Sequence, residues 1–377
     1  MTTSNGMKTD NHGSAGGKDA CRLPLFARFP QLEEMLPRFP LGDFPTPVER
    51  LSHLGHDNLW IKRDDLTSSI YGGNKVRKLE FTLAEALRRG CRQVITMGGI
   101  GTNHGLATAI FCREAGLACK LLLFHQPVNH HVKQNMLLFC AHGAKLRYLK
   151  GVLRTGASLL ITQRLLNPGA YILEAGGSSP VGTVGLVNAM FELVEQIRAG
   201  LMPEPRYIFC PLGTSGTMAG LSLGALLAGL STTVMGVRVT MASVGPVDIA
   251  TPKTVENLMR KTWRLLKKRS TAIPDVSIGP QYVIDDYVGQ GYGCATRECR
   301  AALDLVREKE NITLDPTYTA KAFAALLDYI EKPPYKNAPI LYWHTYSSAD
   351  LTARLQTTDC RMLPPELQRI YEGGDEG

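Results

Sequence analysis

The sequence has no long hydrophobic run. Its longest apolar stretches are Leu121–Phe124 and Leu221–Leu230, and Ser222 and Gly224 interrupt the second. Because a transmembrane helix needs about 20 consecutive apolar residues, we expect no membrane-spanning segment and no membrane partner. The N-terminus also lacks the basic start and apolar run of a signal peptide, so we expect a cytoplasmic protein.

Closely paired cysteines are missing as well. The nine cysteines are an odd number, and no two of them form a Cys-x-x-Cys pair. The closest spacings, Cys112 with Cys119 and Cys294 with Cys299, match no zinc-site pattern. We therefore expect no metal site, and a reducing intracellular compartment is the simpler interpretation.

The chain has a net positive charge, but its basic residues are spread along the sequence. The chain has 42 Lys and Arg against 34 Asp and Glu, a formal net charge of +8. The densest cluster, Arg260–Arg269, has the pattern of a helix with a solvated basic face, and no nucleic-acid-binding module accompanies it. We expect no nucleic-acid partner. A positive field would suit a small anionic substrate or a phosphorylated cofactor.

The composition predicts a packed protein behind a short tail. Hydrophobic residues make up 44% of the 377 residues and charged residues 20%, which is far more apolar than disordered chains. Residues 1–20 contain no Leu, Ile, Val or aromatic residue. Such a segment cannot bury enough surface to offset the entropy of ordering, so we predict a disordered tail over 1–20.

Strand and helix patterns alternate along the rest of the chain. Strands are predicted at 93–97, 120–124, 145–149, 171–173, 207–210, 234–239 and 340–343. Helices are predicted around 106–114, 131–141, 158–166, 184–199, 257–269, 302–309 and 320–331. Repeated strand–helix units predict parallel sheets covered on both faces. We therefore predict an α/β fold with two open, twisted sheets flanked by helices.

A glycine- and hydroxyl-rich loop, Gly213–Leu221, lies between a predicted strand and a predicted helix. Glycines let successive backbone N–H groups converge, and the helix start adds a positive dipole end. The hydroxyls of Thr214, Ser215 and Thr217 can donate to the same anion. The loop is not a Walker A motif, because no Gly-Lys-Ser/Thr follows. We predict a phosphate-binding loop, with an ordinary tight turn as the alternative.

A lysine stands at the start of another predicted helix. Lys75 follows a Gly-Gly-Asn turn, where a cation is disfavoured by the helix dipole. That environment would lower its pKa, which suits an amine that must be neutral to form a Schiff base. The alternative is a lysine with its charge in solvent.

A third loop, Gly98–His104, offers hydroxyl, amide and backbone N–H groups that could hold a carboxylate. His104 alone would more often be a structural histidine. A lysine amine, a phosphate-binding loop and a carboxylate pocket together indicate an amino acid bound to pyridoxal 5'-phosphate (PLP).

Three longer motifs carry a resemblance to a known family. They are Leu59–Leu66 (Leu-Trp-Ile-Lys-Arg-Asp-Asp-Leu), Gly72–Glu80 (Gly-Gly-Asn-Lys-Val-Arg-Lys-Leu-Glu) and Gly98–His104 (Gly-Gly-Ile-Gly-Thr-Asn-His). With Gly176–Ser179, Gly291–Gly293 and Leu314–Lys321, the chain resembles the D-cysteine desulfhydrase and 1-aminocyclopropane-1-carboxylate deaminase family. That family belongs to the tryptophan-synthase-β-like, fold type II PLP enzymes. The resemblance runs from about Leu41 to Thr345.

The resemblance implies a division of the chain and a set of site residues. A smaller domain, 81–166, would be inserted in a larger PLP-binding domain, 21–80 and 167–377, and the enzyme would be a homodimer. Lys75 would form the Schiff base and move the proton at Cα. The implied catalytic residues are Lys75, Thr102, Tyr292 and Tyr318. The implied cofactor-binding residues are Lys75, Asn74, Gly213, Thr214, Ser215, Gly216, Thr217, Thr345 and Thr319, and the implied substrate-binding residues are Thr102, Asn103, His104, Tyr292 and Tyr318.

The residue at position 319 distinguishes the desulfhydrases from the deaminases of this family. The deaminases carry a glutamate that keeps the pyridine nitrogen protonated, whereas this chain has Thr319, as in the desulfhydrases. Thr345 matches the threonine that hydrogen-bonds this nitrogen in the desulfhydrases. A neutral ring nitrogen is a weaker electron sink, adequate for expelling a leaving group from Cβ. We therefore expect a PLP-dependent lyase that performs α,β-elimination on a small D-amino acid, giving pyruvate, ammonia and sulfide.

Two alternative functions stay open, and several residues differ from the pattern of the family. The first alternative is ring-opening deamination or another PLP-dependent reaction, and the second is a non-catalytic binder of PLP or an amino acid. Tyr346 and Ser347 replace two family glycines, Gly101 replaces a glutamine and Thr102 a serine. These changes lie around the substrate, so the substrate need not be D-cysteine.

Overall fold

A computed structural model describes residues 22–374. The larger of its sheets has six strands, in the order β1-β2-β12-β7-β8-β11. All neighbours are parallel except β1 and β2. The bounds are β1 Val48–Arg50, β2 Leu59–Arg63, β7 Tyr207–Leu212, β8 Thr233–Arg238, β11 Tyr282–Ile284 and β12 Ile340–His344.

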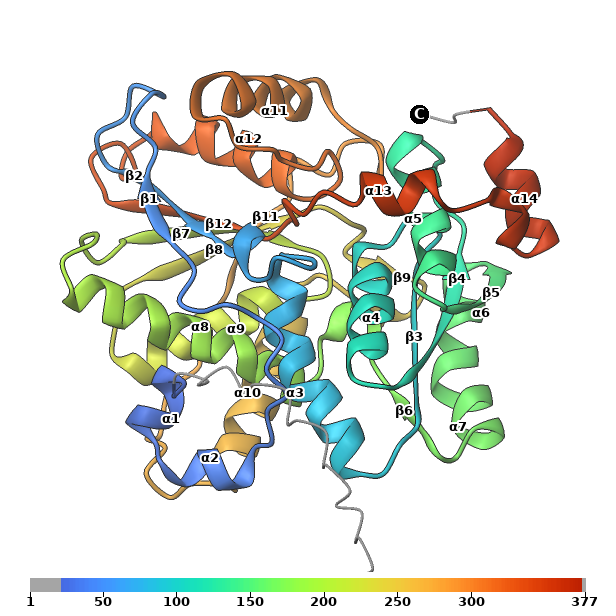
Figure 1. Ribbon diagram of the computed structural model, residues 1–377. Helices are drawn as coiled ribbons and strands as arrows, with labels where there is room; N and C mark the ends of the chain where they lie inside the picture. Colours follow the sequence, from blue (N-terminus) through green and yellow to red (C-terminus); the bar gives the residue numbers. More distant parts are fainter. Residues whose placement is uncertain (1–21, 375–377) are drawn as a thin grey trace, which may run out of the picture.

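Helices cover both faces of this sheet (Figure 1). On one face lie α8 (Pro180–Arg198), α9 (Gly216–Ala228) and α10 (Pro252–Lys267), with the short α1 (Pro24–Arg28) and α2 (Gln31–Met35) beyond them. On the other face lie α11 (Arg297–Glu310) and α12 (Thr319–Ile330). The central strands β7 and β12 are buried along almost their whole length, which explains their nearly continuous apolar runs.

The second sheet has four parallel strands, in the order β5-β4-β3-β6. Their bounds are β3 Gln93–Gly99, β4 Ala118–Phe124, β5 Lys145–Lys150 and β6 Ala170–Ile172. One face is covered by α4 (Asn103–Glu114) and α5 (His130–Ala141). The segment α6 (Val152–Ala157), the π-helix η2 (Ser158–Thr162) and α7 (Gln163–Leu166) follows β5. Each of these two sheets with its helices forms one lobe. Helix α3 (Asn74–Arg88) packs against α8 of the larger lobe and α4 of the smaller lobe, and so connects the two.

The division into domains at 81–166 stays a prediction, but two segments beyond it lie with the smaller sheet. Strand β6 pairs with β3. The C-terminal segment also lies with the smaller sheet, because α13 (Thr352–Gln356) and α14 (Pro365–Glu372) contact α5. Leu363 and Leu367 are buried in the same cluster as the α4 and α5 side chains. Figure 1 shows α14 beside α5.

The predicted α/β fold with two open sheets flanked by helices is confirmed. Five strands were not predicted: β1, β2, β11 and the hairpin of β9 (Ser243–Val244) and β10 (Val247–Asp248). Helix α10 begins earlier than expected, at Pro252, because Thr251 caps it by accepting the N–H of Thr254. The tail predicted over 1–20 lies outside the described residues.

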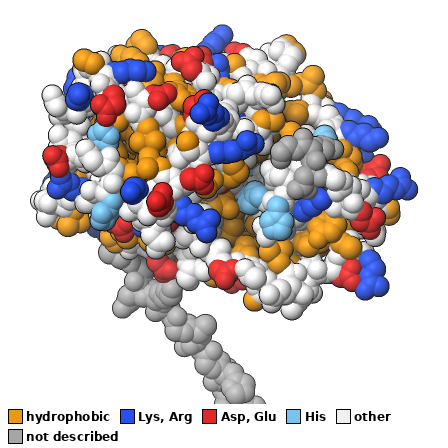
Figure 2. Space-filling view, turned by 90° about the horizontal axis from the view of Figure 1, so that it is seen from above, with side chains coloured by type: hydrophobic (Ala, Val, Ile, Leu, Met, Phe, Trp, Pro, Cys, Tyr) orange, Lys and Arg blue, Asp and Glu red, His pale blue; other side chains and the backbone are white. Residues whose placement is uncertain are grey.

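The surface carries charges of both signs. Figure 2 shows Lys and Arg side chains interspersed with Asp and Glu over one face of the molecule. Within residues 22–374, no helix is both long and apolar enough to cross a membrane.

Candidate active site

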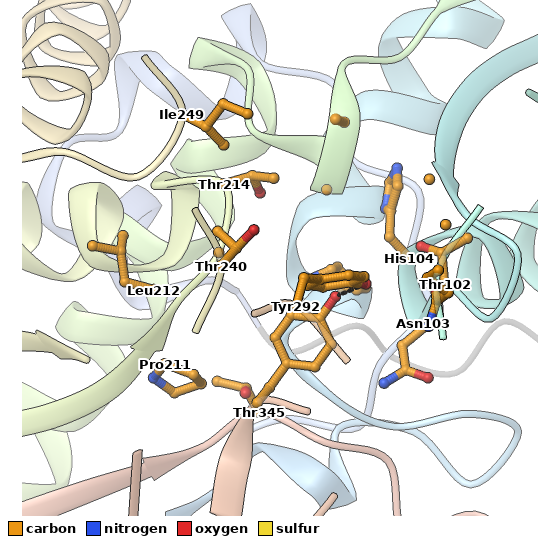
Figure 3. Close-up of a pocket in the computed structure, with 18 of the residues that line it drawn as sticks. Thr102, Asn103, His104, Pro211, Leu212, Thr214, Thr240, Ile249, Tyr292 and Thr345 are labelled. Carbon is orange, nitrogen blue, oxygen red and sulfur yellow. Dashed lines mark hydrogen bonds between the residues drawn. The ribbon is translucent and has the colours of Figure 1, made fainter. Parts of the chain in front are cut away.

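A cavity of about 470 Å³ lies between the two sheets, lined by residues from both lobes. Strands β3, β4, β7 and β12 all end beside it, as expected for a site at the carboxyl ends of parallel strands. Figure 3 shows Thr214 and Thr240 on one side and Thr102, Asn103 and His104 on the other, with Tyr292 between them. The cavity therefore brings together loops that lie far apart in the sequence.

Lys75 lines this cavity from the first turn of α3. Gly73 precedes the helix with φ 93°, and a Cβ there would lie 2.7 Å from the Thr345 carbonyl oxygen. Only glycine fits this close approach. The Lys75 Nζ donates to Asn74 Oδ1 at 3.0 Å. Burial lowers the pKa of Lys75 from 10.5 to about 8, partly opposed by the charge of Asp315.

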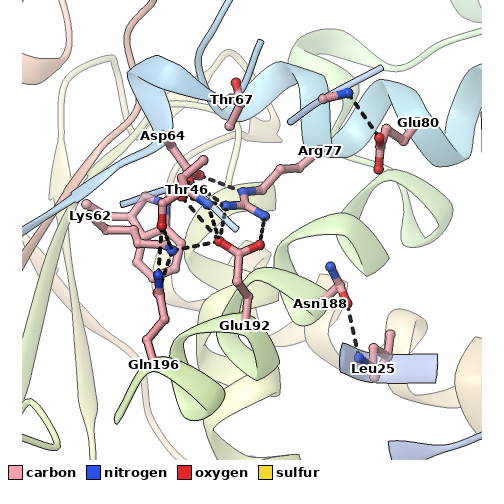
Figure 4. Close-up of polar contacts among 12 residues, drawn as sticks. Leu25, Thr46, Lys62, Asp64, Thr67, Arg77, Glu80, Asn188, Glu192 and Gln196 are labelled. Atoms are coloured by element: carbon pink, nitrogen blue, oxygen red, sulfur yellow. Dashed lines mark hydrogen bonds and ion pairs between the residues drawn. The ribbon is translucent and has the colours of Figure 1, made fainter. Parts of the chain in front are cut away.

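A buried ionic network fixes the start of α3 (Figure 4). The Arg77 guanidinium donates to Asp64 at 2.7 and 2.9 Å and to Glu192 at 2.9 Å. Lys62 Nζ donates to the same Glu192 at 2.6 Å. Asp64 also accepts the indole N–H of Trp343 at 2.7 Å. The network joins β2, α3, α8 and β12 and holds the helix that carries Lys75.

The predicted phosphate-binding loop begins α9. Thr217 Oγ1 accepts from Asn74 Nδ2 at 2.7 Å, and Thr214 Oγ1 lies 2.7 Å from Ser178 Oγ. Ser215 has a left-handed backbone, φ 65°, and its hydroxyl donates to the Ile249 carbonyl at 3.0 Å. The Ser215 side chain is thus committed elsewhere, and this residue offers the cavity its backbone. Gly213 and Gly216 line the cavity with these residues.

A second lysine meets this loop, which the sequence reasoning missed. Lys78 is 1% exposed, and its Nζ donates to the Gly176 carbonyl at 3.0 Å. A Cβ added at Gly216 would lie 2.7 Å from this Nζ. Burial, with the charge of Lys75, holds the Lys78 pKa well below its usual value. The spacing of Lys75 and Lys78, i and i+3 on one helix, was the signal that both could face one site.

The Thr102–His104 loop begins α4. Thr102 Oγ1 caps the helix by accepting the Gly105 N–H at 3.3 Å. Asn103 Oδ1 accepts from Asn135 Nδ2 at 3.0 Å. His104 Nε2 lies 3.0 Å from Thr96 Oγ1, while its buried Nδ1 has no hydrogen-bond partner within residues 22–374. Burial lowers the His104 pKa well below its usual value, so the ring is neutral. All three residues line the cavity.

The two predicted tyrosines meet over the cavity. The hydroxyls of Tyr292 and Tyr318 share a short hydrogen bond, and their rings lie 5.8 Å apart at 75°. Burial raises the pKa of Tyr292 to about 12 and that of Tyr318 well above 10. Both hydroxyls are therefore protonated at neutral pH and can donate.

The structure does not place Thr319 in the lining of the cavity. Thr319 is fully buried, and its hydroxyl donates to Asp315 Oδ2 at 2.9 Å. Asp315, which the sequence reasoning missed, lines the cavity and accepts the N–H groups of Thr317 and Tyr318 at 2.9 and 2.7 Å. Thr345 lines the cavity.

The residues present fit PLP. The backbone N–H groups of Gly213–Thr217 and the amine of the buried Lys78 can donate hydrogen bonds to a phosphate. Asn74 and Lys75 line the same cavity, and Asn74 Nδ2 donates to Thr217 Oγ1 of this loop. A Cβ at Gly216 would displace the ends of the Ser178 and Lys78 side chains from this loop.

Comparisons with known proteins agree with this geometry. The sequence model of the family described as "Pyridoxal-phosphate dependent enzyme" matches residues 40–345. The chain belongs to this family. Two curated relatives are D-cysteine desulfhydrases. One, from Klebsiella pneumoniae, is 34% identical, covering 88% of this chain and 98% of its own length, and one from Serratia proteamaculans is 31% identical, covering 85% and 98%.

A solved structure named as an ACC deaminase homologue is 30% identical, with a TM-score of 0.72, and covers 86% of this chain and 95% of its own. The predictions of a fold type II PLP enzyme and of PLP as the cofactor are confirmed. The roles of the individual site residues stay predictions.

Proposed function

We propose that this PLP-dependent enzyme catalyses α,β-elimination on a small β-substituted amino acid of D configuration. The observation that carries the proposal is the Lys75 amine, with a pKa of about 8, in a cavity between a phosphate-binding loop and the Thr102–His104 loop. The names of the desulfhydrase relatives support the choice of substrate. With D-cysteine and water, the products are pyruvate, ammonia and hydrogen sulfide.

PLP, when bound, supplies an electron sink for the amino-acid Cα. Residues of the protein then bind the substrate and transfer the protons. Lys75 accepts the Cα proton, because lowering its pKa from 10.5 to about 8 raises the neutral fraction of the amine at pH 7 from less than about a thousandth to roughly a tenth. Thr102 and Asn103 hold the carboxylate of the substrate through the hydroxyl and N–H groups at the start of α4.

The two paired tyrosines, Tyr292 and Tyr318, protonate the leaving group. As the Cβ–S bond breaks, its electron pair leaves with the sulfur, which needs a proton. Tyr292 and Tyr318 both line the cavity, and both hydroxyls are protonated and able to donate. Their short mutual hydrogen bond lets one hydroxyl donate while the other stabilises the resulting phenolate.

Ring-opening deamination is the second candidate, since one solved relative is named as an ACC deaminase homologue. Against it, no carboxylate follows Tyr318: the residue there is Thr319, whose hydroxyl is bound to Asp315. A non-catalytic PLP binder is a third candidate. The intact Lys75 and the two tyrosines weigh against it.

A substrate panel tests these candidates. The PLP-loaded protein is incubated with D-cysteine, L-cysteine and 1-aminocyclopropane-1-carboxylate, and pyruvate, sulfide and 2-oxobutanoate are measured. We expect pyruvate and sulfide from D-cysteine, and none from the Lys75→Ala variant. Formation of 2-oxobutanoate alone would favour the deaminase, and binding of PLP without turnover of any amino acid would favour the binder.

We also propose a cytoplasmic homodimer and the division into domains at 81–166. A mass from analytical ultracentrifugation of twice 41.3 kDa would support the dimer, and a monomer mass would refute it. Limited proteolysis that releases no fragment near the proposed boundaries would count against the division.

A further inference from the structure

Tyr346 forms part of the cavity wall at a point where the two lobes meet. It lies in the loop after β12, which belongs to the larger sheet, and it lines the cavity. Its ring packs against the ring of His131 on α5, with centroids 6.0 Å apart and planes at 62°. Since α5 covers the smaller sheet, the contact closes one side of the cavity between the lobes.

His131 is itself held in place. Its Nε2 lies 3.0 Å from Asn103 Oδ1 and 3.3 Å from Asn135 Nδ2. Asn135 Nδ2 also donates to the Gly101 carbonyl at 2.8 Å. Helix α5 lies so close to this loop that a Cβ at Gly101 would stand 2.9 Å from the Val132 Cα. His131, which supports the Tyr346 ring, is therefore fixed to the Gly101–Asn103 segment, which we propose binds the substrate.

The Tyr346 hydroxyl has no role in this support. It makes no hydrogen bond to any other residue of the described part of the chain, although the hydroxyls of Tyr292 and Tyr318 are paired. What Tyr346 contributes to the wall is the volume of its ring. A rigid aromatic wall excludes atoms from the space it fills, because packed side chains cannot yield without cost.

We propose that Tyr346, supported by His131, determines substrate specificity by limiting the length of the substrate side chain. The enzyme then accepts amino acids with short β-substituents, such as a thiol or a chloride, and rejects S-alkyl and S-aryl homologues. This inference rests on the proposed elimination on a small β-substituted amino acid.

The test compares kcat/KM for D-cysteine and S-benzyl-D-cysteine, with pyruvate as the readout. Tyr346→Ala should raise the ratio of the benzyl substrate to D-cysteine at least about tenfold, the lower end of what one methylene contributes to specificity. Tyr346→Phe is the matched control, because it keeps the ring, and its ratio should equal that of the wild type. His131→Ala, which leaves the ring unsupported, should raise the ratio less than Tyr346→Ala. An unchanged ratio in Tyr346→Ala would overturn the proposal.

A binding readout separates this proposal from the proposed function. D-Alanine and D-norleucine lack a leaving group, and their binding is measured from the change in the visible absorbance of the PLP-loaded protein. Tyr346→Ala should strengthen binding of D-norleucine relative to D-alanine, even if the wild type eliminates nothing. Tyr346→Leu, which fills part of the same space, should give an intermediate ratio and covers a failure of the alanine variant to fold. Equal relative affinities in wild type and both variants would refute the proposal.

Discussion

Replacing Glu192 by glutamine removes the charge that two buried cations share. Glu192 is 2% exposed and accepts from Lys62, which is fully buried, and from Arg77, which is 1% exposed. Thr46 N–H also donates to it at 2.9 Å. In the Glu192→Gln variant, Asp64 is the one carboxylate left in contact with Arg77, and Lys62 loses its only ion-pair partner within residues 22–374.

The size of the loss follows from burial and charge. Breaking a buried ion pair by removing one partner costs about 3–5 kcal/mol, because the other charge is left uncompensated. The pKa of Glu192 leads to a similar figure. Burial alone would raise it, but the charges of Arg77 and Lys62 outweigh burial and lower it from 4.5 to about 2, which corresponds to about 3 kcal/mol.

The assay is chemical denaturation followed by far-UV circular dichroism, with Glu195→Gln as the control. Glu195 lies on the same helix, but its pair with Arg198 is exposed, and such pairs contribute about 0–1 kcal/mol. Because the folded-state pKa of Glu192 is depressed, its contribution is present above pH 4.5 and is lost as the pH falls toward 2. The difference between wild type and Glu192→Gln should therefore shrink over that range. Equal midpoints for the two variants at pH 7 would refute the reasoning.

Three further predictions concern the cavity. The rate at which the PLP-free protein gains the visible cofactor band should rise with pH with a midpoint near 8, since Lys75 must be neutral; a midpoint near 10.5 would contradict the burial of its amine. Lys78→Met should weaken PLP binding about 10–100-fold in equilibrium dialysis, the loss expected for a charged hydrogen bond, whereas Lys261→Met, at an exposed position, should not. Gly216→Ala should weaken PLP binding because its Cβ would lie 2.5 Å from Ser178 Oγ and 2.7 Å from Lys78 Nζ; Gly279→Ala, with open space around it, is the control, and equal affinities would contradict the proposed phosphate site.

The sequence patterns predicted the strands that carry the site. Strands such as β3 and β4 lie in parallel sheets with both faces covered, so their apolar runs were easy to recognise. The Gly213–Thr217 loop and the Thr102–His104 loop follow strands of different sheets, so their grouping with Lys75 came from the complementary chemistry of a phosphate-binding loop, a carboxylate pocket and an amine.

Other features depend on packing that no local pattern records. Lys78 reaches Gly176 only because α3 packs against η3 (Ala175–Gly177). Thr319 was expected at the cofactor, yet its hydroxyl is satisfied by Asp315, four positions earlier on the same turn. The pKa of Lys75 is lowered as the sequence predicted, but the contribution of burial cannot be inferred from a polar stretch of sequence.

The most direct test of the central claim is to find which lysine holds PLP. The PLP-loaded protein is reduced with sodium borohydride, which fixes the cofactor to the amine that binds it, and is then digested and analysed by mass spectrometry. The structure predicts the added mass on Lys75, whose Nζ opens into the cavity beside Asn74. The same mass on Lys78, or on no lysine of the cavity, would contradict the account.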